Sequence, residues 1–180
     1  VYKHGLATRI MHGICAVCCV CLIVTGCMLL FGFKAGSEMV ALIHCMLGLV
    51  FVVAPLVWAI TNWKEFCAFI SNIFHYDKDD AGWIKAPMGG YLDAFIGRKD
   101  NPSYVPPQGK YNTGQKLAGV FLMLGGLALG MTGLIMWAAS GNGIFGLHID
   151  VAPQAVMILW RIHLVVAILM TLLVCVHFVM

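Results

Sequence analysis

Four histidines lie in segments that are otherwise apolar enough for lipid, and their spacing is regular. The stretch "WRIHLVVAILMTLLVCVHFVM" at residues 160–180 holds His163 and His177, fourteen residues apart. Fourteen helical residues turn about 1400°, close to four whole turns, and rise about 21 Å. Both rings therefore share one helix face at two depths. A neutral imidazole can ligate a metal, and a titratable ring in lipid is costly without a partner, so the pair predicts a function inside the membrane.

The composition predicts the elements that carry these rings. The chain is 61% hydrophobic and 11% charged, which is typical of a membrane protein. We predict an all-α fold, a four-transmembrane-helix bundle, and a single domain over residues 1–180. The predicted helices cover about residues 10–33, 39–61, 117–139 and 155–180. The net charge of +3 is small and dispersed, which argues against a nucleic-acid partner.

The connections between the helices are unequal, and their charges predict the topology. The segment 64–116 holds seven lysines and arginines, whereas the opposite side has only Lys34 and, near the start of the last helix, Arg161. By the positive-inside rule both termini and this long loop are cytoplasmic. The stretch 83–105 mixes aromatic residues with glycine and proline, and we expect it to be interfacial or partly re-entrant.

This topology sorts the four histidines into two pairs. His44 and His163 fall near the outer face, and His12 and His177 near the cytoplasmic face. Two neutral imidazoles that converge from different helices are what a six-coordinate haem iron needs, and bundle cores hold such cofactors. The pattern predicts two b-type haems stacked across the membrane, which would conduct electrons.

Glycines recur at the spacing of the histidines. Gly26 lies fourteen residues after His12, Gly119 and Gly133 are also fourteen apart, and Gly48 is one turn past His44. A haem is flat and wide, so we predict that these four glycines face it. The alternative is that membrane helices use glycine for close packing in any case.

Other readings of the reactive residues remain open. Four histidines could bind one metal ion, but metal ligands converge at one point and these divide between two depths. The rings could instead be proton relays of a haem-free transporter or channel. The eight cysteines are interpreted mainly as small apolar residues, and the Cys15–Cys18 pair lacks the following histidine of a c-type haem site. We expect three further histidines to be solvated: His4, His75 and His148. Arg161 either pairs with a haem propionate or reaches the lipid headgroups.

Five motifs, in order and covering nearly the whole chain, carry a family resemblance. They are "RIMHG" at 9–13, "LIHCMLGL" at 42–49, "KYNTGQK" at 110–116, "TGLIMW" at 132–137, and the His163/His177 pair. With them the chain resembles the cytochrome b (gamma) subunit of respiratory formate dehydrogenases, within a wider group that includes the cytochromes b of nickel–iron hydrogenases and thiosulfate or polysulfide reductases. The resemblance implies a subunit of the bacterial inner membrane with two haems b. It also implies an iron–sulfur (beta) subunit and a molybdenum or tungsten catalytic (alpha) subunit as partners, and leaves the oligomeric state of the complex open.

The resemblance also implies a quinone site in "KYNTGQK". In that family the Asn, Gly and Gln of the motif bind the quinone beside the cytoplasmic haem, and here they are Asn112, Gly114 and Gln115. Electrons would reduce menaquinone or another quinone there, while substrate oxidation takes place in the partner subunits. Asn112 and Gln115 could instead form an ordinary helix start, with Asn112 as the N-cap.

Overall fold

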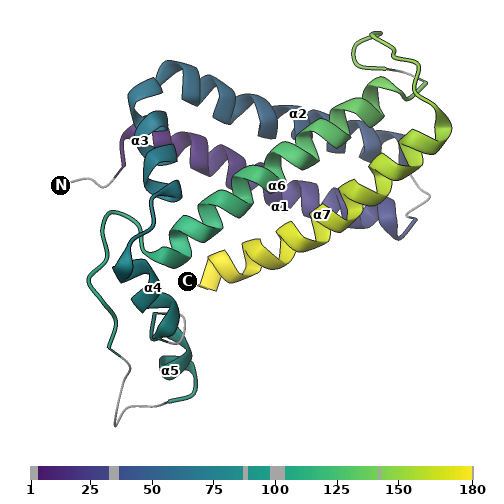
Figure 1. Ribbon diagram of the computed structural model, residues 1–180. Coiled ribbons are helices and arrows are strands. Elements are labelled where there is room, and N and C mark those ends of the chain that lie inside the picture. The colour runs from purple at the N-terminus through teal and green to yellow at the C-terminus, as the bar shows by residue number, and fades with distance from the viewer. Residues whose placement is uncertain (1–3, 33–36, 87–88, 98–103, 142, 180) are drawn as a thin grey trace. The chain divides into compact units, whose positions relative to one another are not determined.

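The computed structural model describes residues 4–32, 37–86, 89–97, 104–141 and 143–179. All the secondary-structure elements in these residues are helices, which confirms the all-α prediction (Figure 1). Among the described residues, four helices are long and apolar enough to cross a membrane, as predicted. They are α1 (Leu6–Leu30), α2 (Ser37–Thr61), α6 (Thr113–Ala138) and α7 (Pro153–Val179).

Three shorter helices occupy the segment that we predicted to be a loop. They are α3 (Trp63–Phe74), α4 (Lys78–Lys85) and α5 (Tyr91–Phe95). α3 is amphipathic: the polar residues Lys64, Glu65 and Ser71 are exposed, whereas Ile73 is 1% exposed. The stretch expected to be interfacial or re-entrant contains the end of α4 and all of α5, and its residues 87–88 and 98–103 lie outside the described part.

The chain forms two compact units. One contains α1, α2, α7 and the part of α6 after Leu122, and the other contains α3, α4, α5 and the part of α6 up to Leu122. Both pairs of intramembrane histidines belong to the first unit. The "KYNTGQK" motif belongs to the second. Which termini face the cytoplasm stays a prediction from charge.

The helix boundaries differ from the expected ones for identifiable reasons. α6 begins four residues before the predicted position because Asn112 caps it: the Asn112 carbonyl accepts from the Lys116 N–H at 2.9 Å, and its Oδ1 accepts from the Gln115 N–H at 2.8 Å. α1 ends after Leu30, and Gly32 adopts a left-handed φ of +70°, which a helix cannot continue. α7 begins at Pro153, whose missing N–H costs nothing in the first helical turn.

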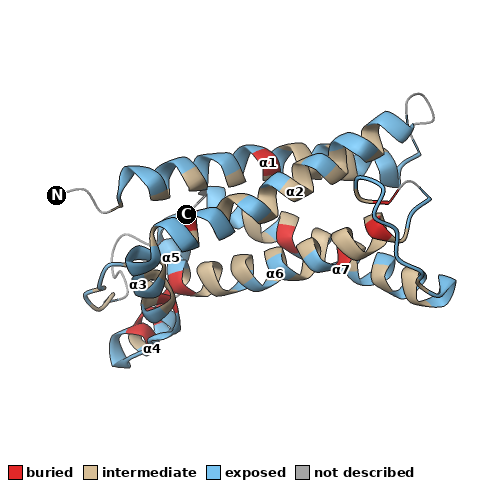
Figure 2. Ribbon diagram, turned by 90° about the horizontal axis from the view of Figure 1, so that it is seen from above, coloured by how far each residue is buried: buried red, intermediate tan, exposed pale blue. Residues whose placement is uncertain are grey.

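The surfaces of the four long helices are mostly exposed or half-buried (Figure 2). Apolar surface of this kind suits contact with lipid. α1 packs on α2, and the Trp58 Nε1–H donates to Thr8 Oγ1 at 3.1 Å between them. Glycines bring α6 close to its neighbours: a methyl at Gly130 would lie 2.6 Å from Val52, and one at Gly125 would overlap Met170. Small residues at such contacts are how membrane helices approach closely.

Candidate functional site

The four intramembrane imidazoles lie in two pairs, and each pair joins two different helices. The rings of His44 (α2) and His163 (α7) have their centres 6.4 Å apart at an interplanar angle of 64°. The rings of His12 (α1) and His177 (α7) have their centres 6.3 Å apart at 53°. His44 and His163 are half-buried, whereas His12 and His177 are exposed.

These separations fit two imidazoles on opposite sides of one metal ion. An imidazole nitrogen binds a first-row metal at about 2.0–2.1 Å and lies about 1.1 Å from its ring centre, so two rings that held one metal ion between them would have centres about 6.2–6.4 Å apart. Direct edge-to-face ring contacts fall in the same range of distances, about 4.5–7 Å. For the His44–His163 pair, the hydrogen bonds to the rings favour metal ligation over a direct ring contact.

One pair is held by hydroxyl groups in a way that suits metal ligation. The Nδ1 atom of His44 lies 2.8 Å from Thr25 Oγ1, and the Nδ1 atom of His163 lies 2.8 Å from Thr132 Oγ1. A hydrogen bond at one ring nitrogen orients a histidine and leaves the other nitrogen for a metal, as at most histidine metal sites. Neither threonine was predicted from the sequence to bond a histidine, although Thr132 begins the "TGLIMW" motif.

Two of the four predicted glycines lie against these rings. A methyl group at Gly26 would be 3.5 Å from His44 Cε1, and one at Gly133 would be 3.3 Å from His163 Cε1. A methyl at Gly48 would meet no atom within 4 Å. At Gly119 it would lie 3.1 Å from Ile73 of α3, so the neighbour of this glycine in the structure is a helix. A haem-facing role for all four stays a prediction.

The remaining reactive residues form no metal cluster in the part of the chain that the structure describes. No three His, Cys, Asp or Glu side chains converge there. All eight cysteines are free. Arg161 is exposed and donates to Met157 Sδ at 3.8 Å. His75 and His148 are exposed, as expected, and His4 is half-buried.

The predicted quinone motif forms the start of α6. Asn112 Oδ1 accepts from the Gln115 N–H at 2.8 Å, and Gln115 Oε1 accepts from the Asn112 N–H at 3.1 Å. This reciprocal pair is a capping box, which satisfies two backbone donors at a helix start. The cap uses the oxygen of each side-chain amide, so what Asn112 and Gln115 can offer a ligand is their NH₂ groups. Gln115 is exposed, and Asn112 and Gly114 are half-buried.

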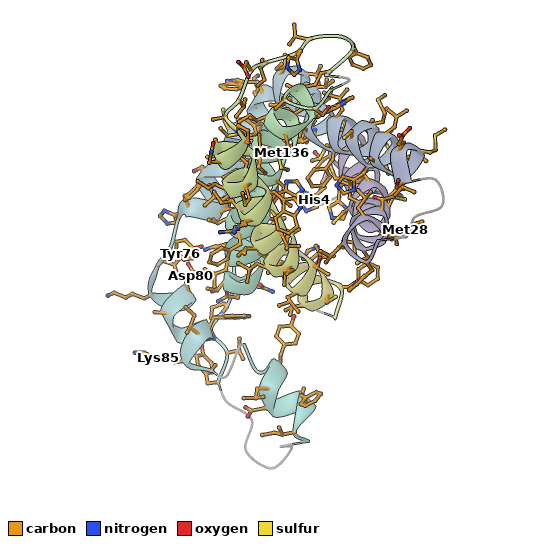
Figure 3. All side chains as sticks on the ribbon, turned by 90° about the vertical axis from the view of Figure 1, so that its right-hand side faces the viewer. His4, Met28, Tyr76, Asp80, Lys85 and Met136 are labelled. Atoms are coloured by element: carbon orange, nitrogen blue, oxygen red, sulfur yellow. The ribbon has the colours of Figure 1, made fainter. Side chains whose placement is uncertain are left out.

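A buried ion pair fixes the first turn of α6 to α4. The Lys116 ammonium donates to Asp80 Oδ2 at 2.7 Å, to Asp80 Oδ1 at 2.9 Å and to the His75 carbonyl at 3.0 Å. Asp80 also accepts from Thr113 Oγ1 at 2.7 Å and from the Asp77 N–H at 2.9 Å. Asp80 lies near the first residue of α4, and Lys85 at its last (Figure 3).

The carboxylate of this pair is held in its charged form. Burial alone would raise the pKa of Asp80, but the hydrogen bonds from Lys116, Thr113 and the Asp77 backbone, with the Lys116 charge, bring that pKa below its ordinary value. The network orders the polypeptide that leads into Asn112 and Gln115. It was not predicted.

Four apolar helices with paired imidazoles in the bundle define the class of membrane cytochromes. The profile of the family described as prokaryotic cytochrome b561 matches residues 3–180, and the chain therefore belongs to that family. No curated protein matches the sequence. The protein is accordingly a multi-pass protein of the bacterial inner membrane, a haem b electron carrier that works with redox partner subunits.

Proposed function

We propose that this chain is the di-haem membrane subunit of a formate dehydrogenase-type complex, which passes electrons from an iron–sulfur subunit through two haems b to a quinone on the cytoplasmic side. The observation that carries the proposal is the presence of two separate imidazole pairs with ring centres 6.4 and 6.3 Å apart. The two imidazoles of each pair are suited to be the axial ligands of one haem. A haem bound there would supply one-electron chemistry. In this proposal His44 and His163 ligate one haem, and His12 and His177 the other.

The formate dehydrogenase assignment rests on the "KYNTGQK" motif and on the partners that it implies. A nickel–iron hydrogenase or a thiosulfate or polysulfide reductase could use the same membrane subunit with another catalytic arm. The proposal predicts that formate reduces the b haems in membrane vesicles that contain the assembled complex. Hydrogen and reduced sulfur compounds are the matched alternatives, and the absorbance of reduced haem b reports which donor works. Haem reduction by hydrogen but not by formate would assign the chain to the hydrogenase group instead.

The quinone site is proposed at the first turn of α6. A quinone carbonyl is a hydrogen-bond acceptor and gains negative charge on reduction. The side-chain NH₂ groups of Asn112 and Gln115 are donors, because the capping box engages only their oxygens. Gly114 lies between them and allows close approach of a ring to the backbone. The positive end of the helix dipole also favours a reduced quinone there.

Removal of these donors without loss of the helix cap tests the site. Aspartate at 112 and glutamate at 115 keep the capping oxygens but lack the NH₂ group. We expect Asn112→Asp and Gln115→Glu each to slow haem reoxidation by a menaquinone analogue about tenfold, because one hydrogen bond to a reduced quinone is worth about 1–2 kcal/mol. Haem content and donor-driven haem reduction stay unchanged. Stopped-flow absorbance measures both phases.

The matched control is Gln108→Glu, which adds the same charge a few residues before the motif. Gln108 Oε1 accepts from the Thr113 N–H at 3.1 Å, a bond that a glutamate oxygen can also accept, and the variant loses only the long Nε2 bonds of 3.3–3.4 Å to three backbone carbonyls. This variant is expected to reoxidise like the native protein. Native reoxidation rates in Asn112→Asp and Gln115→Glu as well would reduce the motif to a helix cap.

A further inference from the structure

A Thr-Gly dipeptide contacts each histidine of the His44–His163 pair. Thr25 bonds His44, and the next residue, Gly26, faces the same ring. Thr132 bonds His163, and the next residue, Gly133, faces that ring. The two dipeptides lie in α1 and α6. Each of these helices comes directly before the long helix that carries the contacted histidine. Both rings of this pair are therefore contacted in the same way by the same dipeptide.

The direction of both hydrogen bonds follows from the other contacts of the hydroxyl groups. Thr25 Oγ1 donates to the Cys21 carbonyl at 2.8 Å, and Thr132 Oγ1 donates to the Ala128 carbonyl at 2.7 Å. A hydroxyl has a single proton, so a threonine that gives it to the carbonyl accepts from the ring. In this arrangement each ring carries its proton on Nδ1 and donates it to threonine. Nε2 keeps its lone pair, which is the tautomer that a metal ligand at Nε2 needs.

The other pair differs in this respect. In the described part of the chain, no hydroxyl group bonds a ring nitrogen of His12 or His177, and both side chains are exposed. Donation from Nδ1–H raises the basicity of an imidazole ligand. A more basic axial ligand stabilises the oxidised state of a bound iron. Hydrogen bonds to the axial histidines are among the factors that set the potential of a haem.

We propose that Thr25 and Thr132 are positioning residues that fix the Nε2-ligating tautomer of His44 and His163 and lower the reduction potential of the group bound between them. The inference rests on the proposed function, because it takes this pair as axial ligands. A lower potential at this pair favours release of its electron toward the His12–His177 pair. The direction of electron flow would then be built into two threonine hydroxyls.

The test is a redox titration of the assembled complex, followed by haem absorbance, with Thr25→Val and Thr132→Val. Valine keeps the shape of threonine and removes the hydroxyl. We expect each variant to shift the equilibrium constant of one haem component about threefold toward reduction, an upward shift of about 28 mV for one electron. The shifts add in the double variant, and the second component stays in place. Thr25→Ser and Thr132→Ser restore the hydroxyl and are expected to titrate like the native protein.

The control is Thr171→Val in α7. Thr171 Oγ1 makes the same kind of bond, to the Ala167 carbonyl at 2.8 Å, and Thr171 is half-buried like Thr25, whereas Thr132 is buried. The Thr171→Val variant is expected to leave the potentials of both haem components unchanged. If a valine variant loses its haem, Thr25→Ala or Thr132→Ala is titrated in its place, because alanine adds no bulk near the ring.

The outcomes separate the two levels of the argument. Two haems in the native protein, with unmoved potentials in all valine variants, overturn the role of the threonines and leave the proposed function standing. An equal shift in Thr171→Val also overturns this role, since the effect would then come from the loss of the bond between a threonine hydroxyl and a carbonyl of its own helix. A native protein without two titrating b haems overturns the proposed function itself.

Discussion

The variant His163→Ala is expected to hold one haem b per chain, where the proposed function gives the native complex two. Its ring lies 6.4 Å from that of His44, and no second ligand of the same kind replaces it in the described residues around this pair. The remaining haem is expected to be bound between His12 and His177, about 21 Å away along the helix, as fourteen residues of rise require. The pyridine haemochrome assay on the assembled complex counts the haems, and low-temperature spectra identify which component is absent.

The four histidines predict a pattern and not only a loss. His44→Ala removes the same spectral component as His163→Ala, and His12→Ala and His177→Ala remove the other. Any haem that a variant retains at the mutated pair would be five-coordinate and high-spin, which also assigns the replaced ring as its ligand. His75→Ala is the control, because its side chain is exposed in the second unit, and it is expected to keep both haems. A His163→Ala protein with two unaltered low-spin haems contradicts the assignment.

The fold and the histidine pairs could be read from the sequence because lipid leaves few choices. A chain that crosses a bilayer satisfies its backbone internally, so long apolar runs become helices. On a helix, a spacing of fourteen residues fixes both face and depth, and the structure brings together the rings that this spacing put at equal levels. Periodicity describes a single helix, however, and says nothing about which neighbour lies against it.

That limit explains what the sequence did not reveal. Thr25 and Thr132 act across helix contacts, and the sequence signal for them was weak: the same Thr-Gly dipeptide in two apolar helices. Gly119 shares the spacing that predicted a haem-facing residue, yet Ile73 of α3 lies next to it. α3 was not predicted because its polar face resembles a loop. The start of α6 was placed too late because Lys116 looked like the edge of the span, whereas its charge is neutralised by Asp80, 36 residues away in the chain.

Removal of either partner of the Asp80–Lys116 pair is expected to open the second unit. The Lys116 and Asp80 side chains are 11% and 4% exposed, and every donor of the ammonium has an acceptor in the structure. An unpaired charge left in such a site costs about 3 kcal/mol, the lower end of the range for buried pairs. Lys116→Met or Asp80→Asn should therefore raise the rate of proteolytic cleavage in the segment 64–116 about a hundredfold, if cleavage follows the open population.

Variants of the pair distinguish charge burial from a general loss of packing. In Lys116→Met the carboxylate is left unpaired, and in Asp80→Asn the ammonium is, so the double variant removes both uncompensated charges. We expect the increase in cleavage rate of the double variant to be smaller than the product of the increases in the two single variants. A double-mutant cycle measures this difference. Asp79→Asn is the control: Asp79 is exposed and adjacent, and its loss should change cleavage little. Equal and additive effects in all variants would contradict the role of the pair.

The pair also predicts how the second unit responds to acid. Because the folded protein holds the pKa of Asp80 below its ordinary value of 3.8, the unfolded segment binds a proton at a higher pH than the folded one. The contribution of the pair to stability is thus full above about pH 5 and declines as the pH falls through 3.8 toward the lowered pKa. Proteolysis with an acid-stable protease should accelerate in that window in the native protein. In Asp80→Asn the carboxyl is absent and this acceleration should be smaller, whereas an identical acid response in both proteins would show that other groups control the opening.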